Sequence, residues 1–187
     1  MSEHVVLFAG PMGSGKTTAI GSLSEIDVVS TEATNTDRAT ANKETTTVAL
    51  DYGEITLDDV TKVRLYGVPG QKRFDFMWSI LAGRARGLLL LINNDAPDSV
   101  NLLVKYLGDF RELHERGAVI IGVTKSDVAS TPTVAEYAAA LTAAVPEQLI
   151  PVFTVDPRNA DEMRTLLLSL IASVEMRELL APAPEKI

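Results

Sequence analysis

The chain has 187 residues, of which 46% are hydrophobic and 22% charged, a profile typical of one globular domain. Lys and Arg number 17 against 25 Asp and Glu, and the resulting net charge of −8 argues against non-specific binding to nucleic acid or to an anionic membrane. The absence of cysteine excludes disulfides, thiolate catalysis, cysteine-based metal sites, and palmitoyl or prenyl anchors. Ser2 in place of glycine excludes an N-myristoyl anchor.

The apolar runs are short. The densest, residues 88–92 and 119–123, fall far below the roughly 18 residues that a membrane-spanning helix needs. Glu3 and His4 stand where a basic leader would begin. We therefore expect a cytoplasmic protein with no membrane segment, no lipid anchor and no nucleic-acid partner.

Six apolar runs of strand length alternate with amphipathic stretches. They are residues 4–10, 48–55, 63–67, 87–93, 118–124 and 149–155. Runs that are apolar at every position indicate strands covered on both faces, and most of the intervening segments are long enough to form helices. The pattern predicts an α/β fold with a central six-stranded, mostly parallel sheet and helices on both faces. Because no helix fits between 48–55 and 63–67, these two runs are expected to form an antiparallel hairpin.

Three segments are expected to be helical besides the one that follows the first strand. Apolar residues recur at three- and four-residue steps over 163–174 and, more loosely, over 103–110. Residues 134–145 form an alanine-rich stretch with Pro132 at its first turn. The last seven residues contain two prolines and predict a flexible tail, so residues 1–180 are expected to form a single domain and residues 181–187 the tail.

Residues 31–47 are rich in threonine and contain no large apolar side chain. The next large apolar residue, Val48, lies just after the segment. Nothing in this segment indicates a helix or a strand. A long loop in a compact domain is often functional, and a disordered surface insertion is the alternative.

Residues 10–17 read Gly-Pro-Met-Gly-Ser-Gly-Lys-Thr and fit the pattern G-x-x-x-x-G-K-[ST] between a strand and a helix. The glycines allow backbone N–H groups to converge on one point at the start of the helix, which favours a polyphosphate. Lys16 can bind the β- and γ-phosphates, and the Thr17 hydroxyl can bind Mg²⁺. A glycine-rich turn with a solvated lysine is the alternative. The expected phosphate-binding residues are Gly10, Gly13, Ser14, Gly15, Lys16, Thr17 and Thr18.

Residues 124–127 read Thr-Lys-Ser-Asp directly after the fifth strand. An ionised Asp127 can accept hydrogen bonds from guanine N1–H and from its exocyclic amine, whereas adenine presents an acceptor at N1. Lys125 can lay its aliphatic stem on the base. Asp127 could instead be an ordinary helix cap. With Thr124, these residues form the expected base site.

The Thr124–Asp127 segment resembles the guanine-specificity motif T-K-x-D of some Ras-like GTPases. Residues 67–71, Gly-Val-Pro-Gly-Gln, resemble the D-x-x-G-Q motif of the same proteins but lack its Asp. Among them, the missing Asp and the Val-Pro-Gly-Gln that follows resemble the bacterial small GTPases of the MglA type. The run TTTVALDYGEI at residues 45–55 resembles bacterial GTPases related to the signal-recognition-particle receptor β subunit. The resemblance implies a Ras-like G domain of the P-loop NTPase class that binds GTP, GDP and Mg²⁺.

The resemblance also implies roles for individual residues. Gly70 would sense the γ-phosphate, Gln71 would orient the attacking water, and Lys16 would complete the catalytic set. Thr47, before the second strand, would bind Mg²⁺ together with Thr17 when the γ-phosphate recruits its loop. Asp51 is a candidate to replace the carboxylate missing at Gly67.

Other positions depart from the family pattern. Met12 stands where Ras has glycine and would crowd the entry of an external arginine finger. Residues 156–158, Asp-Pro-Arg, align with the S-A-K base motif, which adds Pro157 and Arg158 to the nucleotide-binding residues. Pro157 has no N–H to donate, which predicts a weaker guanine preference than that of Ras. Arg38, Lys43 and Arg73 are candidates for an arginine finger within the chain.

Residues 74–81 are apolar on nearly every side of a helix. One sheet face cannot bury all of them, so this segment is expected to dock a partner, although burial against a neighbouring helix is equally consistent. By the resemblance, the partner would be a roadblock-type activator or an effector that contacts residues 31–47 and 68–84.

The sequence therefore predicts a small GTPase that acts as a guanine-nucleotide-dependent switch with slow intrinsic hydrolysis. One alternative is a GTP-binding module with little or no turnover. Another is a P-loop small-molecule kinase, which would need an arginine-bearing lid where this chain has a threonine-rich loop.

Overall fold

A computed structural model of the chain describes residues 2–34, 47–58, 61–69, 81–116 and 118–180. The strands are β1 (Ser2–Ala9), β2 (Val29–Thr34), β3 (Thr47–Thr56), β4 (Thr61–Gly67), β5 (Gly87–Asn93), β6 (Ala118–Thr124) and β7 (Val152–Thr154). The helices are α1 (Lys16–Leu23), α3 (Ser99–Asp109), α4 (Arg111–Arg116), α5 (Val134–Ala144) and α6 (Ala160–Leu180).

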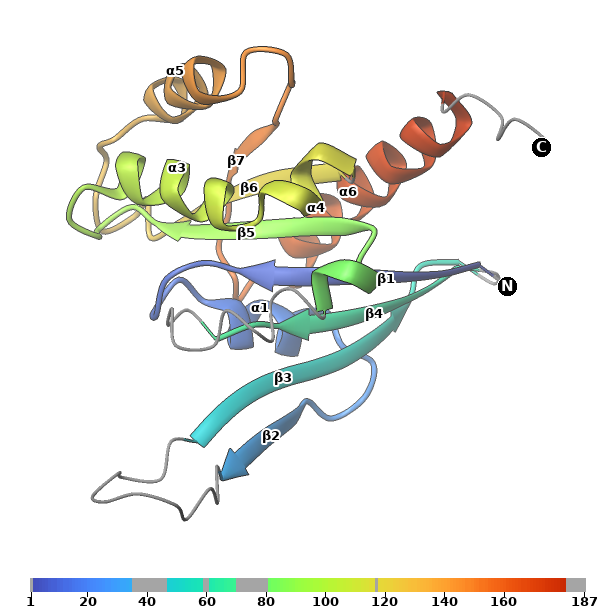
Figure 1. The fold of residues 1–187 in the computed structure, drawn as a ribbon. Coiled ribbons are helices and arrows are strands. Elements are labelled where there is room, and N and C mark those ends of the chain that lie inside the picture. Colours follow the sequence, from blue (N-terminus) through green and yellow to red (C-terminus); the bar gives the residue numbers. More distant parts are fainter. Residues whose placement is uncertain (1, 35–46, 59–60, 70–80, 117, 181–187) are drawn as a thin grey trace, which may run out of the picture.

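All seven strands belong to one sheet in the order β2-β3-β4-β1-β5-β6-β7 (Figure 1). The pairs that β1 makes with β4 and β5 are parallel, as are β5–β6 and β6–β7. The pairs β2–β3 and β3–β4 are antiparallel. In a parallel sheet whose strand order reverses at β1, the loops after the carboxyl ends of β1 and its neighbours are the expected place for a ligand.

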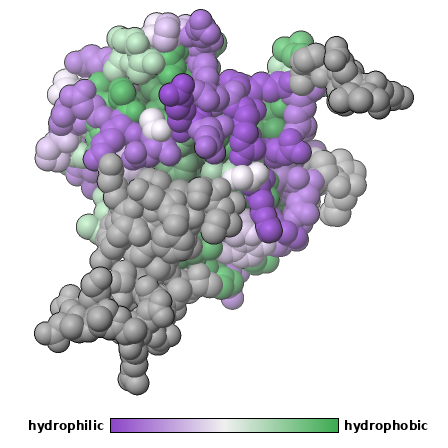
Figure 2. Space-filling model, viewed as in Figure 1, coloured by the Kyte–Doolittle hydropathy of each residue, from purple (hydrophilic) through white to green (hydrophobic). Residues whose placement is uncertain are grey.

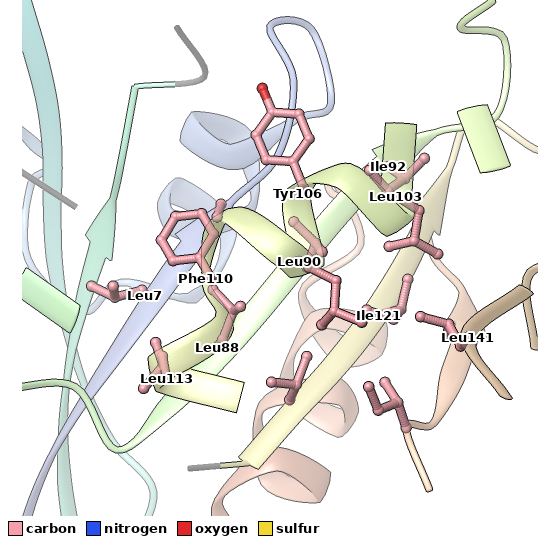
Figure 3. Close-up of a cluster of buried hydrophobic side chains, with 14 of the residues drawn as sticks. Leu7, Leu88, Leu90, Ile92, Leu103, Tyr106, Phe110, Leu113, Ile121 and Leu141 are labelled. Carbon is pink, nitrogen blue, oxygen red and sulfur yellow. The ribbon is translucent and has the colours of Figure 1, made fainter. Parts of the chain in front are cut away.

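Helices α3, α4 and α5 cover one face of the sheet, and α1 and α6 cover the other (Figure 1). On the first face, Leu88, Leu90 and Ile92 of β5 pack against Leu103 of α3 and Leu141 of α5 (Figure 3). The alternate β5 residues, Leu89 and Leu91, pack on the α6 side. Every residue of β5 and of β6 is buried, so the prediction of strands covered on both faces is confirmed.

The sheet has seven strands, and the predicted number of six was therefore wrong. The missed strand, β2, includes Thr31–Thr34 of the segment that we expected to lack secondary structure. Among the described strands, β2 pairs with β3 alone, in the register Val29 with Tyr52 to Thr34 with Thr47. Since an edge strand needs no second apolar face, its polar sequence Val-Ser-Thr-Glu-Ala-Thr gave no hydrophobic signal.

Several other predictions are confirmed. β3 and β4 form the antiparallel hairpin, and α3, α5 and α6 cover the three predicted helical stretches. The expectation that Pro132 lies in the first turn of α5 was wrong, because Thr133 caps the helix, with its hydroxyl accepting from Glu136 N, and Pro132 precedes that cap. The expected tail, residues 181–187, lies outside the described residues.

Hydrophilic residues predominate on the described part of the face shown in Figure 2. The buried residues are arranged in the two clusters on either side of the sheet. Within the described part of the chain, no helix is both long and apolar enough to cross a membrane.

Candidate functional site

The loop between β1 and α1 is wound tightly at its glycines. Gly10, Gly13 and Gly15 have φ angles of 138°, 81° and 92°. A Cβ atom at Gly10 would overlap the carbonyl group of Leu91, so this loop passes closely over the end of β5. The Ser14 hydroxyl is buried and has no hydrogen-bond partner among the described residues. A loop of this shape at a helix N-terminus presents backbone N–H groups to an anion.

Lys16 reaches back over the same loop. Its Nζ donates to the carbonyl oxygens of Gly10 and Pro11 at 2.9 and 2.8 Å. Burial lowers the pKa of Lys16 to about 8, and the nearby charge of Asp51 partly opposes that shift. The loop therefore holds a cation at its centre, where a phosphate chain would need one.

Asp51 of β3 lies beside the first turn of α1. The Thr17 hydroxyl donates to Asp51 Oδ2 at 2.5 Å, and the Ser30 hydroxyl of β2 donates to Oδ1 at 2.7 Å. The Asp51 side chain is buried, and both of its oxygens are thereby fixed. Residues of α1 and β2 thus hold the Asp51 carboxylate of β3 next to the Thr17 hydroxyl, which we predicted from the sequence to bind Mg²⁺.

Asp51 also lies directly opposite Gly67. The two residues are register partners in the β3–β4 pair. A Cβ atom at Gly67 would lie 3.1 Å from Asp51 Cβ and 3.3 Å from Asp51 Oδ2. The neighbouring strand therefore places a carboxylate against the position where the family pattern has its Asp.

A cavity of about 650 Å³ opens beside the phosphate loop. Four segments line it: the loop after β1 with the first turn of α1, the loop after β5, the loop after β6, and the loop after β7 with the start of α6. Among its lining residues are the predicted Gly13, Ser14, Gly15, Thr18, Thr124, Lys125, Asp127, Pro157 and Arg158. Segments distant in the sequence thus meet at one site of a size suited to a nucleoside.

Direct contacts join these segments. The Thr124 hydroxyl donates to the carbonyl oxygen of Ser14 at 3.2 Å, which ties the end of β6 to the phosphate loop. A Cβ atom at Gly15 would lie 2.6 Å from Pro157 Cγ, so the loop after β7 also packs against the phosphate loop. Both base-site segments are therefore held at fixed places relative to the phosphate site.

The loop after β7 is organised by Asp156. Its carboxylate accepts three hydrogen bonds from the Arg158 side chain, from Nε to Oδ1 at 2.9 Å, from Nε to Oδ2 at 3.1 Å and from Nη2 to Oδ2 at 2.7 Å. The Arg158 guanidinium lowers the pKa of the Asp156 carboxyl to about 2. Glu162 of α6 accepts from Asp156 N at 2.8 Å, which fixes the backbone of the loop.

Some predicted site residues cannot be placed. Gly70 and Gln71 lie outside the described residues, as do the arginine-finger candidates Arg38, Lys43 and Arg73. Thr47 is the first residue of β3, and its side chain also lies outside the description. Most of the two expected partner segments, 31–47 and 68–84, is likewise not described. Met12 is described and is 78% exposed.

Asp95 and Glu162 line the cavity as well, and our sequence analysis did not select them. A signal for Asp95 was available, because it follows the apolar run of β5 at the same edge of the sheet as the phosphate loop. Glu162 gave no such signal, since an acidic residue in the first turn of a helix is common.

Within the described residues, no group of three or more His, Asp or Glu side chains could hold a metal ion by itself. A Mg²⁺ ion would instead need the Thr17–Asp51 pair together with oxygens of a bound phosphate chain. Hydroxyl and carboxylate oxygens are suitable ligands for that ion, which commonly keeps several waters and phosphate oxygens.

Comparison with known proteins gives a matching family model and similar solved structures. The model of the family described as "Conserved hypothetical ATP binding protein" matches residues 26–175. No curated protein matches the sequence. The solved structure of the Arl6 BBS3 small GTPase from Trypanosoma brucei, with the bound nucleotide analogue GppNp, superposes with a TM-score of 0.68 at 17% identity. That similarity covers 94% of this chain and 99% of the other, and it shows that the two share an α/β fold of the Ras-like type.

Proposed function

We propose that this chain, which belongs to the family of conserved hypothetical ATP binding proteins, is a slow nucleoside triphosphatase. Although the description of the family names ATP, we propose that this chain prefers GTP to ATP. The observation that carries the proposal is the continuity of the phosphate loop with the cavity that contains Asp127. A triphosphate bound by the loop at residues 10–17 would direct its base toward the segments after β6 and β7. The small-GTPase fold supports the same reading.

Asp127 decides the proposed preference for guanine. Its carboxylate can only accept hydrogen bonds when ionised, and guanine offers two donors on the edge that would face it. Adenine would present a lone pair at N1 to the carboxylate where guanine presents a donor, and the resulting repulsion costs affinity. Pro157 supplies no N–H to the base, so the proposed discrimination depends mainly on Asp127.

A bound Mg²⁺ ion would neutralise charge on the phosphate oxygens. We assign Thr17 and Asp51 to it, and Thr47 as a further ligand from the segment that precedes β3. Lys16 would contribute to the stabilisation of the β- and γ-phosphates. Asp51 could act directly or through a bound water, as the Asp of the family pattern does.

Gly70 and Gln71 complete the proposed hydrolytic site by their resemblance to the D-x-x-G-Q motif. Gln71 would orient water toward the γ-phosphate, and Gly70 would report whether that phosphate is present. Hydrolysis would be slow without a partner, because no arginine finger is assigned. The proposed switch would use residues 31–47 and 68–84 to contact a roadblock-type activator or an effector in the cytoplasm.

Calorimetry with purified protein and Mg²⁺ tests the base preference. We expect GDP to bind at least tenfold more tightly than ADP, and Asp127→Ala to abolish most of the difference. Asp98→Asn is the matched control, because Asp98 is exposed and does not line the cavity. Equal affinities for the two nucleotides in the unmodified protein would show that the base preference is wrong and would favour an adenine ligand.

The metal assignment predicts that Asp51→Asn raises the Mg²⁺ concentration needed for half-maximal GTP binding. Ser30→Ala should raise it less, because Thr17 still fixes the other carboxylate oxygen. Glu54→Gln, on the same strand but paired with Lys62, should leave it unchanged. An unaltered Mg²⁺ requirement in Asp51→Asn, in a variant that melts like the parent, would remove Asp51 from the metal site.

Single-turnover hydrolysis of GTP tests turnover itself. We expect slow loss of GTP without any added acceptor, and a slower reaction in Gln71→Leu at unchanged GDP affinity. No hydrolysis, with or without cell extract, would favour a binding module. Phosphoryl transfer only upon addition of a small-molecule acceptor would favour a kinase.

A further inference from the structure

The loops after β5 and β6 are joined by an ion pair at the cavity. Lys125 Nζ lies 3.0 Å from Asp95 Oδ2. Both residues line the cavity, and they follow Asn93 and Thr124, which are register partners in the β5–β6 pair. The Lys125 side chain therefore extends toward β5, away from the rest of its own loop.

Asp95 is itself held in place. The side-chain amide of Asn93 donates to Asp95 Oδ1 at 2.8 Å, so that each carboxylate oxygen has one donor. Asn93 is only 8% exposed, and its own Oδ1 has no partner. The Asn93 amide and then the Lys125 ammonium lower the pKa of the Asp95 carboxyl. Asp95 is therefore ionised at neutral pH and oriented toward Lys125.

The second cation of the cavity is tethered in a similar way. Arg158 makes its hydrogen bonds to Asp156, and the charge of Asp127 contributes to the raised pKa of Arg158. Among the described residues, the ion pairs of the two cavity cations are Lys125–Asp95 and Arg158–Asp156, and neither includes Asp127. Each cation is thus paired with a carboxylate other than Asp127, although both cations come from loops that line the same cavity.

We propose that Asp95 is a specificity-determining residue, because it holds the Lys125 ammonium away from Asp127 and leaves that carboxylate free to accept from a guanine base. Lys125 precedes Asp127 by two residues in one loop. Without Asp95, its ammonium is free to pair with Asp127. An Asp127 neutralised in this way is a weaker acceptor for guanine, and it no longer repels the N1 lone pair of adenine.

This inference rests on the proposed function and gives Asp95 a role that differs from simple support of the loop. Loss of loop support would weaken the binding of both nucleotides. Loss of charge separation weakens the binding of guanine nucleotides selectively. In the second case the Lys125 ammonium causes the loss of affinity for guanine nucleotides, so removal of this ammonium should restore that affinity.

The test compares GDP and ADP affinities by calorimetry in a set of variants. Asp95→Asn should bind GDP about tenfold more weakly, as expected for a charge-assisted hydrogen bond that is lost, with ADP affinity changed less than about twofold. Asp95→Glu should restore GDP binding. Lys125→Met keeps the apolar stem without its charge, so Asp95→Asn with Lys125→Met should bind GDP more tightly than Asp95→Asn alone. Asp98→Asn should behave like the parent protein.

Equal losses for GDP and ADP in Asp95→Asn, or no recovery in the double variant, would overturn the inference. A crystal structure of nucleotide-free Asp95→Asn gives a readout that needs no base preference. It should show Lys125 Nζ within about 4 Å of an Asp127 oxygen. If the parent protein does not prefer GDP, the proposed function fails, and this distance then decides by itself whether Asp95 separates the two charges.

Discussion

Gly13 and Gly15 share a left-handed backbone in the phosphate loop but have different surroundings. A Cβ atom at Gly13 would meet nothing within 4 Å, whereas at Gly15 it would lie 2.6 Å from Pro157 Cγ. Gly13→Ala should therefore cost only the backbone strain of about 1–2 kcal/mol. Gly15→Ala should add an overlap of about 1–3 kcal/mol and displace the loop after β7.

Thermal unfolding of the two variants measures this difference. We expect Gly15→Ala to have a lower melting temperature than Gly13→Ala. The double variant Gly15→Ala with Pro157→Gly should recover part of the decrease in melting temperature. Equal melting temperatures for both single variants would mean that the contact between Gly15 and Pro157 contributes nothing to stability.

At the scale of elements, Tyr137 joins α5 to the end of β5 and to α3. Its hydroxyl donates to Asn94 Oδ1 at 2.8 Å and forms a second hydrogen bond with the Ser99 hydroxyl at 2.7 Å. Tyr137 is fully buried, and Asn94 Nδ2 donates in turn to the carbonyl oxygen of Ala129 in the loop after β6. Tyr137→Phe should destabilise the fold by about 1–3 kcal/mol, because it leaves Asn94 Oδ1 buried and unpaired. Urea unfolding measures this change.

The same hydroxyl predicts how stability depends on alkaline pH. Burial raises the pKa of Tyr137 above its ordinary value of about 10. Between about pH 10 and the raised pKa, the unfolded chain releases the Tyr137 proton while the folded chain retains it. The contribution of this hydroxyl to the free energy of unfolding is therefore fully present below about pH 10 and is lost as the pH rises through the raised pKa. Tyr137→Phe should show a weaker fall over this range. An identical pH dependence in the two proteins would contradict this prediction.

At the scale of the whole molecule, the site lies at the carboxyl ends of parallel strands. Its segments follow β1, β5, β6 and β7, which contribute to the cores on both faces. A ligand that binds only this assembled site stabilises the entire fold by about 2.7 kcal/mol at 100 times its dissociation constant, or roughly 5–10 °C in melting temperature.

GDP with Mg²⁺ should produce this increase in a thermal melt, and ADP at the same concentration should produce a smaller one. Lys16→Ala should reduce the effect of both nucleotides, because the loop then lacks its central cation. An increase of equal size in Lys16→Ala would place the binding of these nucleotides elsewhere.

The sequence by itself determined the sheet core, and it predicted the glycine-rich loop and the segment after β6 as a nucleotide site. An apolar run such as Leu88–Ile92 indicates a buried strand by its composition alone. The residues Gly10, Gly15 and Lys16 lie close together in the chain, so their spacing can be recognised in the sequence without a structure. The edge strand β2 could not be detected in this way, since its pairing depends on a neighbour rather than on an apolar face.

Only the tertiary structure decided which polar and charged side chains contact one another. Asp51 reaches Thr17 because β3 pairs with β4 in one particular register, and Asp95 reaches Lys125 because β5 and β6 end together at one edge of the sheet. Electrostatic and hydrogen-bond interactions depend on distance in space, and residues that lie 30 or 34 positions apart along the chain carry no local sign of such a contact.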